Sequence, residues 1–138
     1  MDERGLPVAP EWIILGDFSL QAGCAAARTW IDMADRPTAI FCASDQIALS
    51  LISELARLDI RVPDDVSVMG FDDIDLAEKF IPPLTSIRQD RLLIGETAAD
   101  MLLERLSTSE TPAAPSISIV PVSLIERDST APLGPPDI

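Results

Sequence analysis

The chain has 138 residues, 47% of them apolar and 24% charged, which suits one folded domain around a single core and makes a disordered protein unlikely. It contains no His, so catalytic triads built on His and His-ligated zinc sites are excluded. Ten Lys and Arg against 23 Asp and Glu leave a formal net charge of −13, which repels a phosphate backbone, and we expect this chain not to bind nucleic acid.

The compartment is predicted from the cysteines and the first residues. Cys24 and Cys42 lie among apolar neighbours without C-x-x-C spacing, which is typical of buried free thiols in a reducing environment. No apolar run approaches the roughly 20 residues that cross a membrane, and residues 1–5 have neither a basic nor an apolar signal region. We therefore expect a cytoplasmic protein without membrane contact.

The first half of the chain alternates strand and helix patterns. Residues 11–18 form an apolar run that predicts a strand, and Ser19 is a suitable N-cap for a helix that reaches about residue 34. The expected buried face of this helix recurs at intervals of three and four residues, at Leu20, Cys24, Ala27, Ile31 and Ala34. Residues 39–43 predict a second strand, apolar on both faces, and a helix follows over 45–58.

The same alternation continues in the second half. A strand, a short helical stretch, a strand and a helix are predicted over residues 66–71, 74–80, 84–88 and 90–106. Two final strands are expected around Pro121, at 117–120 and 122–125, and the tail from residue 129 onward is expected to fray. This order predicts the fold class α/β, with a doubly wound parallel sheet.

Acidic residues recur where three of the predicted strands end. Asp17, Asp45 and Asp72 are separated by 28 and 27 residues, the length of one strand–helix unit. Such positions gather at the carboxyl edge of an open α/β sheet, where ligands bind, and the polar residues expected there are Asp17, Ser44, Asp45, Asp72 and Gln89. With Phe18 as an aromatic face, this chemistry favours a polyhydroxylated or nucleoside-like ligand. The alternative is that the Asp and Ser residues are helix N-caps and that Phe18 is a core aromatic.

Other motifs for chemistry are missing from the sequence. Residues 72–75 lack the Gly and the terminal Glu of a calcium loop. No glycine-rich phosphate loop or nucleophile elbow is present either. We therefore expect no metal site, no cofactor and no enzymatic activity.

The predicted helix over 45–58 has an unusually wide apolar face. Its polar side chains form a narrow stripe, made of Gln46, Ser50, Ser53, Glu54 and Arg57. The remaining apolar arc spans about 200°, more than one sheet covers, so it indicates a surface for a partner. The alternative is a helix wedged between the sheet and a neighbouring helix of the same chain.

A series of motifs resembles the effector-binding domain of the LacI/GalR family of bacterial transcription regulators. The motifs are GDFS at 16–19, PTAIFCASDQIA at 37–48, VPDDVSVMGFDD at 62–73, PLTSIRQ at 83–89, GETA at 95–98 and ERDS at 126–129. They follow the order and spacing of the family over about residues 12–130. A series this long is highly specific.

The resemblance implies a periplasmic-binding-protein-like fold, in which an effector binds in a cleft between two subdomains. Residues 1–87 and about 116–130 would form the C-terminal subdomain, and a strand–helix segment over about 88–115 would belong to the N-terminal subdomain. Most of that N-terminal subdomain and the DNA-binding domain would then be absent from this chain. DNA would be bound only through that absent domain.

The resemblance also assigns roles to single residues. Phe18 matches an aromatic position that packs against the effector, Asp72 an effector-binding acid, and Gln89 a polar group of the cleft. Ser44 takes a position often filled by Asn, and we add the neighbouring Asp45 to the effector-binding set. A homodimer is implied through the helix after residue 45 and the segment 74–81, with Leu49, Ile52 and Phe80 in the interface.

The first functional hypothesis is the effector-binding and dimerisation part of a LacI-type regulator that senses a small sugar-like or nucleoside-like ligand. The second is a sugar-binding protein of a transport system with the same fold, which the lack of a signal region disfavours. A small α/β enzyme is disfavoured by the missing catalytic motifs.

Overall fold

The computed structural model describes residue 5 and residues 8–107 and 116–133. Its sheet has the order β1 (Ala39–Phe41), β2 (Ser67–Asp72), β3 (Thr85–Gln89) and β4 (Val122–Ile125). The pairs β1–β2 and β2–β3 are parallel, and β4 runs antiparallel to β3. The expected α/β fold is confirmed, with a mostly parallel sheet and one antiparallel strand.

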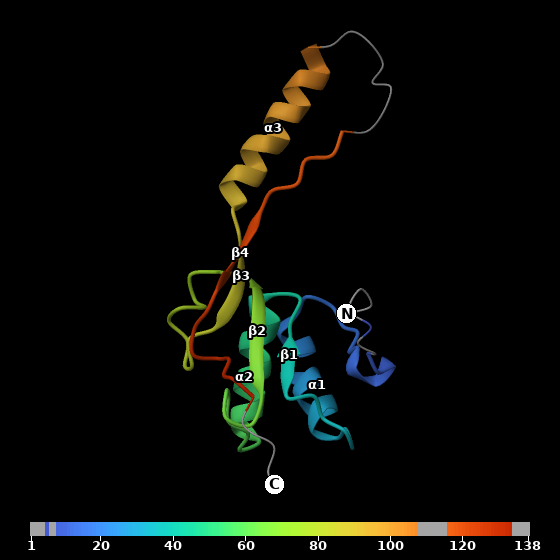
Figure 1. Ribbon diagram of the computed structural model, residues 1–138, viewed down its shortest axis with the longest axis vertical. Helices are drawn as coiled ribbons and strands as arrows, with labels where there is room; N and C mark the ends of the chain where they lie inside the picture. Colours follow the sequence, from blue (N-terminus) through green and yellow to red (C-terminus); the bar gives the residue numbers. More distant parts are fainter. Residues whose placement is uncertain (1–4, 6–7, 108–115, 134–138) are drawn as a thin grey trace.

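Two helices cover one side of this sheet. Figure 1 shows α1 (Leu20–Ile31) and α2 (Asp45–Arg57) lying together behind β1 and β2. The core between the helices and the sheet is built from α2 and the strands, with Leu51, Leu55, Val66, Val68 and Leu84 among its most buried side chains. Among the residues that the structure describes, no helix is long and apolar enough to cross a membrane.

The helix α1 begins where the sequence predicts, because the Ser19 hydroxyl accepts a hydrogen bond from the amide of Ala22. Its buried face differs from the expected one. Leu20 and Ala34 are exposed, and the buried residues are Gly23, Ala26, Ala27 and Trp30. The small residues of that set allow α1 to lie close against α2.

The predicted polar stripe of α2 is also different in the structure. Glu54 is buried and accepts hydrogen bonds from Nε and Nη2 of Arg28, at 3.0 and 2.8 Å, so this side of α2 faces α1. Leu49 and Ile52 are buried within the same chain. Most of the wide apolar arc is therefore covered within the same chain, which favours the alternative of a wedged helix.

Several predicted strands and helices do not form. The strand predicted over residues 11–18 is absent, since Pro10–Trp12 form a short 3-10 helix and residues 13–18 join no sheet among the described residues. Leu15 is 90% exposed. Residues 74–80 form hydrogen-bonded turns rather than a helix, with the amide of Ala77 donating to the carbonyl of Ile74 at 2.8 Å. Residues 117–120 are not a strand, and β1 is exposed at both of its ends instead of buried on both faces.

The expected fraying of the tail is wrong at its first residue. Ser129 is fully buried, and its hydroxyl donates to the carbonyl of Val68 at 2.6 Å and accepts from the amide of Thr85 at 2.8 Å. The hydroxyl thus bridges β2 and β3. Residues 134–138 lie outside the described part of the chain.

The helix α3 (Arg91–Ser107) stands apart from the rest. Figure 1 shows it extending away from the sheet beyond β3 and β4. None of its residues is buried, and its apolar side chains Leu92, Leu102, Leu103 and Leu106 are exposed.

Candidate effector site

Two of the predicted site residues meet at the carboxyl edge of the sheet. Asp72 is the last residue of β2 and Gln89 is the last residue of β3. The strands are parallel, and their register pairs Asp72 with Arg88, so Gln89 lies one residue further along. The side-chain amide Nε2 of Gln89 donates to Oδ1 of Asp72 at 2.6 Å. The expected convergence of these two side chains is present.

The backbone at this edge is in an unusual conformation. Asp72 has φ of 111° and Asp73 has φ of 52°, in a region that residues with a side chain rarely adopt. Each such residue costs about 1 kcal/mol or more, so other contacts must hold this turn.

A buried carboxylate supplies those contacts. Oδ2 of Asp45 accepts from the amide of Ile74 at 2.8 Å, and Oδ1 accepts from the Ser86 hydroxyl at 2.6 Å. The same hydroxyl accepts from the amide of Asp73 at 3.1 Å. Burial raises the pKa of Asp45, although the hydrogen bonds from Ser86 and Ile74 partly oppose that rise.

The placement of Asp45 corrects the expectation that it binds the effector. Its side chain is 0% exposed, and both carboxylate oxygens already accept hydrogen bonds from the protein. A ligand at the surface therefore has no access to it.

Ser44 and Asp17 serve the backbone around them. Ser44 is buried, and its hydroxyl caps α2 by accepting from the amide of Ile47 at 3.3 Å. Oδ1 of Asp17 accepts from the amide of Ser19 at 3.1 Å and also from its hydroxyl. The hydrogen bond from the Ser19 hydroxyl lowers the pKa of Asp17. The structure thus shows the helix-cap alternative for Ser44 and a local turn for Asp17.

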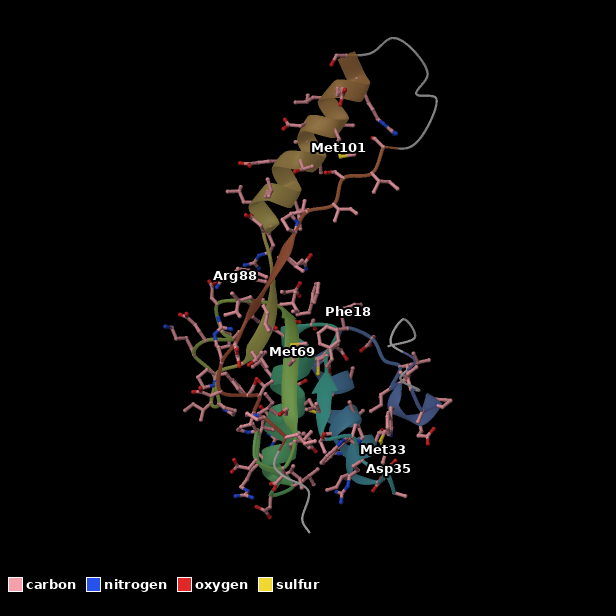
Figure 2. All side chains as sticks on the ribbon, viewed as in Figure 1. Phe18, Met33, Asp35, Met69, Arg88 and Met101 are labelled. Atoms are coloured by element: carbon pink, nitrogen blue, oxygen red, sulfur yellow. The ribbon has the colours of Figure 1, made fainter. Side chains whose placement is uncertain are left out.

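Phe18 is not a core aromatic, since 71% of its surface is exposed. Figure 2 shows it at the end of the sheet that also carries Arg88, while Asp35 lies at the opposite end. Phe18 lines a small cavity with Asp17 and Phe41, whereas Gln89 lines a larger open cavity with Arg88 and Arg127. The structure places both residues toward one end of the sheet but in separate cavities.

Asp73 is a charged site residue that the sequence reasoning missed. Its carboxylate is almost fully buried and forms ion pairs with Nη2 of Arg127 at 2.7 Å and with Nε of Arg88 at 2.6 Å. Burial alone would raise the pKa of Asp73, but the hydrogen bonds and charges of Arg127 and Arg88 outweigh it and hold the pKa below its usual value. The neighbouring acids at 72 and 73 are visible in the sequence, but their partners are not, because Arg127 lies 54 residues further along the chain.

The acidic side chains that the structure describes at this edge do not form a metal-binding cluster. Within residues 8–107 and 116–133, no group of three or more His, Cys, Asp or Glu side chains is arranged to hold a metal ion.

This architecture, with the ends of parallel strands forming one polar edge, is typical of α/β domains that bind a ligand at that edge. Residues 1–130 match the family described as "Periplasmic binding protein-like domain", and the chain belongs to that family. The resemblance of its motifs to LacI/GalR effector-binding domains is confirmed by relatives and by solved structures.

The relatives are regulators by name. The chain is 50% identical over 106 residues to the "HTH-type transcriptional repressor PurR" of Photobacterium profundum, in an alignment that covers 77% of this chain and 32% of that protein. The chain therefore spans about a third of the length of this curated relative.

Two solved structures show the same fold. A LacI-type transcription regulator from Bifidobacterium animalis subsp. lactis DSM 10140 superposes with a TM-score of 0.83 at 33% identity, over 94% of this chain and 46% of the other. A LacI family transcriptional regulator from Enterococcus faecium with bound ribose superposes with a TM-score of 0.76 at 33% identity, over 88% of this chain and 44% of the other.

Proposed function

We propose that the chain is the effector-binding and dimerisation part of a LacI-type transcription regulator that senses a small sugar-like or nucleoside-like ligand. The observation that carries this proposal is the contact between Asp72 and Gln89 at the carboxyl edge of the sheet. The repressor name of the relative from Photobacterium profundum supports the regulatory role. Such a regulator acts in the cytoplasm and is not an enzyme, and it binds DNA through a domain other than this one.

The class of ligand follows from the side chains at this edge. A carboxylate and a side-chain amide can pair with neighbouring hydroxyls, and the exposed ring of Phe18 offers an apolar face. The regulator from Enterococcus faecium holds ribose, a sugar that nucleosides also contain. Ribose and nucleosides are therefore the first compounds to test.

We assign residues 1–87 and about 116–130 to one subdomain and about 88–115 to a second. The exposed apolar side chains of α3 support this division, since a helix of a complete subdomain would bury such a face. Residues 108–115 lie outside the described part of the chain. With one side of the cleft, we expect only roughly millimolar affinity, because a small ligand normally has most of its surface buried.

The homodimer is proposed to use the segment 74–81 rather than the face of α2. Leu49 and Ile52 are buried inside the chain, whereas Phe80 is partly buried and Ile81 is 88% exposed. Sedimentation should show a dimer that Ile81→Asp dissociates. Leu15→Asp is the matched control, since Leu15 is 90% exposed and lies outside this segment. Equal association of both variants would remove the segment from the interface.

The binding proposal is tested by NMR titration of the labelled chain with ribose and with inosine. Shifts should cluster near Phe18, Asp72 and Gln89, and Asp72→Asn should weaken binding because an amide presents donors to the same hydroxyls. Asp35→Asn is the control, since it removes one charge at the opposite end of the sheet (Figure 2). Equal affinities for wild type and Asp72→Asn, or shifts that cluster elsewhere, would refute the assignment.

A sugar-binding protein of a transport system would have the same fold, so the coding sequence upstream of this chain is what distinguishes the two functions. A helix-turn-helix encoded directly upstream in the same reading frame supports the regulator, and a signal peptide there supports the transport protein.

A further inference from the structure

We propose that Asp45 is a positioning residue, which holds the effector acid Asp72 in its binding geometry from inside the protein. This inference rests on the proposed function, because it assumes that Asp72 contacts the ligand. Asp45 itself is buried and touches no ligand.

The geometry connects Asp45 with the residues that follow Asp72. The carboxylate of Asp45 accepts the amide of Ile74 directly, at 2.8 Å. The carboxylate also accepts a hydrogen bond from the Ser86 hydroxyl at 2.6 Å, and this hydroxyl accepts a hydrogen bond from the amide of Asp73 at 3.1 Å. Two consecutive amides after Asp72 are thereby fixed, one directly and one through Ser86.

The conformation of the turn explains why it needs this support. Asp72 and Asp73 both have positive φ, and neither is a glycine, so this conformation is unfavourable without outside contacts. The φ of Asp72 also sets the direction of its side chain, which accepts from Gln89 at 2.6 Å. Relaxation of the turn would therefore turn the Asp72 carboxylate away from Gln89.

The strand β2 is shaped to let the carboxylate approach. A Cβ atom at Gly70 would overlap Oδ1 of Asp45 and would lie 2.9 Å from Cδ2 of Leu84. Glycine at this position allows Asp45 to come close beneath the strand that ends in Asp72.

The competing explanation is that Asp45 only stabilises the start of α2, where a negative charge interacts favourably with the helix dipole. However, the cap of α2 is the Ser44 hydroxyl, and the hydrogen bonds to the Asp45 side chain come from Ile74 and Ser86. The contacts of Asp45 are therefore directed at the turn after Asp72.

The first experiment needs no ligand. In the labelled chain, the side-chain amide protons of Gln89 report its hydrogen bond to Asp72, and the backbone amides of Asp73 and Ile74 report the turn. Asp45→Asn and Ser86→Ala should move the Gln89 signals toward values of a solvent-exposed amide, while the signals of the remaining core stay folded. The control Asp35→Asn should leave the Gln89 signals in place. Unchanged Gln89 signals in folded Asp45→Asn or Ser86→Ala would overturn the proposal, and a merely structural role of Asp45 predicts that outcome.

Ser86→Ala provides a second test of the proposal in case Asp45→Asn does not fold. Ser86→Ala removes both hydrogen bonds of the Ser86 hydroxyl, to Oδ1 of Asp45 and from the amide of Asp73, and leaves the contact of Asp45 with the amide of Ile74. If Asp45→Asn does not fold, the Gln89 signals of Ser86→Ala decide the matter alone.

The second experiment measures ribose binding by NMR titration. Ser86→Ala should weaken binding about tenfold, the effect of one misaligned hydrogen bond to a charged group, and should add little to Asp72→Asn when the two are combined. Additive losses would overturn the positioning role. If wild type does not bind ribose, or Asp72→Asn binds it equally well, the proposed function fails, while the Gln89 signals still test whether Asp45 holds Asp72.

Discussion

Gly23 determines how closely α1 approaches α2, and its replacement by alanine should destabilise the fold. A Cβ atom at this position would overlap the carbonyl oxygen of Ile47 and the hydroxyl of Ser50, and would lie 2.9 Å from the amide nitrogen of Leu51. Two of these three atoms belong to the backbone of α2. A side-chain rotation cannot relieve the overlap, so the helices must move apart.

Two effects of opposite sign determine the magnitude. Alanine is favoured over glycine inside a helix by about 1 kcal/mol. Overpacking a tight contact costs about 1–3 kcal/mol, and a clash with backbone lies at the upper end of that range. We expect a net loss of about 2 kcal/mol in the free energy of unfolding. For a chain of this size, the loss lowers the Tm by roughly 6–10 °C.

The assay is thermal unfolding followed by circular dichroism, with Gly95→Ala as the matched control. Gly95 lies in α3, and a Cβ atom there would have no neighbour within 4 Å. The control therefore keeps the gain in helix propensity without the clash, and its Tm should not fall. An unchanged or raised Tm for Gly23→Ala would refute the close packing of α1 on α2.

Three further predictions concern single polar groups. Ser129→Ala should lower the free energy of unfolding, measured by urea denaturation, by about 2 kcal/mol, because it leaves buried backbone groups of β2 and β3 without their hydrogen-bond partner. The control Ser118→Ala should have no effect, because Ser118 is exposed. Burial raises the pKa of Cys42 to about 12, so a thiol reagent at pH 8 should modify this thiol only after unfolding, and rapid reaction in the native state would contradict its burial. The hydrogen bond from Arg28 lowers the pKa of Glu54 in the folded state, so the ionised carboxylate stabilises the fold when the pH is above its unfolded pKa of about 4.3. This stability is lost as the pH falls through the lower pKa of the folded state. Glu54→Gln should therefore flatten the loss of stability between about pH 5 and pH 3 in acid unfolding, and an unchanged pH profile would contradict a stabilising ion pair between Arg28 and Glu54.

The pattern of α2 shows how far periodicity predicts a fold. The helix is predicted correctly, and the cap at Ser44 agrees with the alternative given for that residue, because both depend on residues close together in the sequence. The polar stripe was identified from the same periodicity, but the sequence does not show that its Glu54 is buried against Arg28 of α1, 26 residues earlier. A charge pattern on one helix does not reveal whether a distant segment supplies the opposite charge, so the exposure of the stripe could not be predicted.

Predicted strands fail for a similar reason. Residues 13–18 and 117–120 have the apolar composition of strands, but a strand exists only with a hydrogen-bonded neighbour. Neither segment has one among the described residues. The tail shows the opposite case, since a proline-bearing end was expected to fray while Ser129 is held by backbone groups more than 40 residues away.

The site depends on the same distinction between local and distant contacts. The spacing of Asp17, Asp45 and Asp72 correctly predicts an acid at the start of α2 and an acid at the end of β2, but Asp17 follows no strand among the described residues. Equal spacing also does not give the three acids equal roles. Asp17 accepts from its neighbour Ser19, Asp45 is buried against the turn that follows β2, and Asp72 reaches Gln89 at the end of β3. Of the three acids, Asp72 is therefore the one that lies beside another residue predicted to bind the effector. Under the positioning role proposed for Asp45, a substitution at this buried acid should act on the ligand only through Asp72.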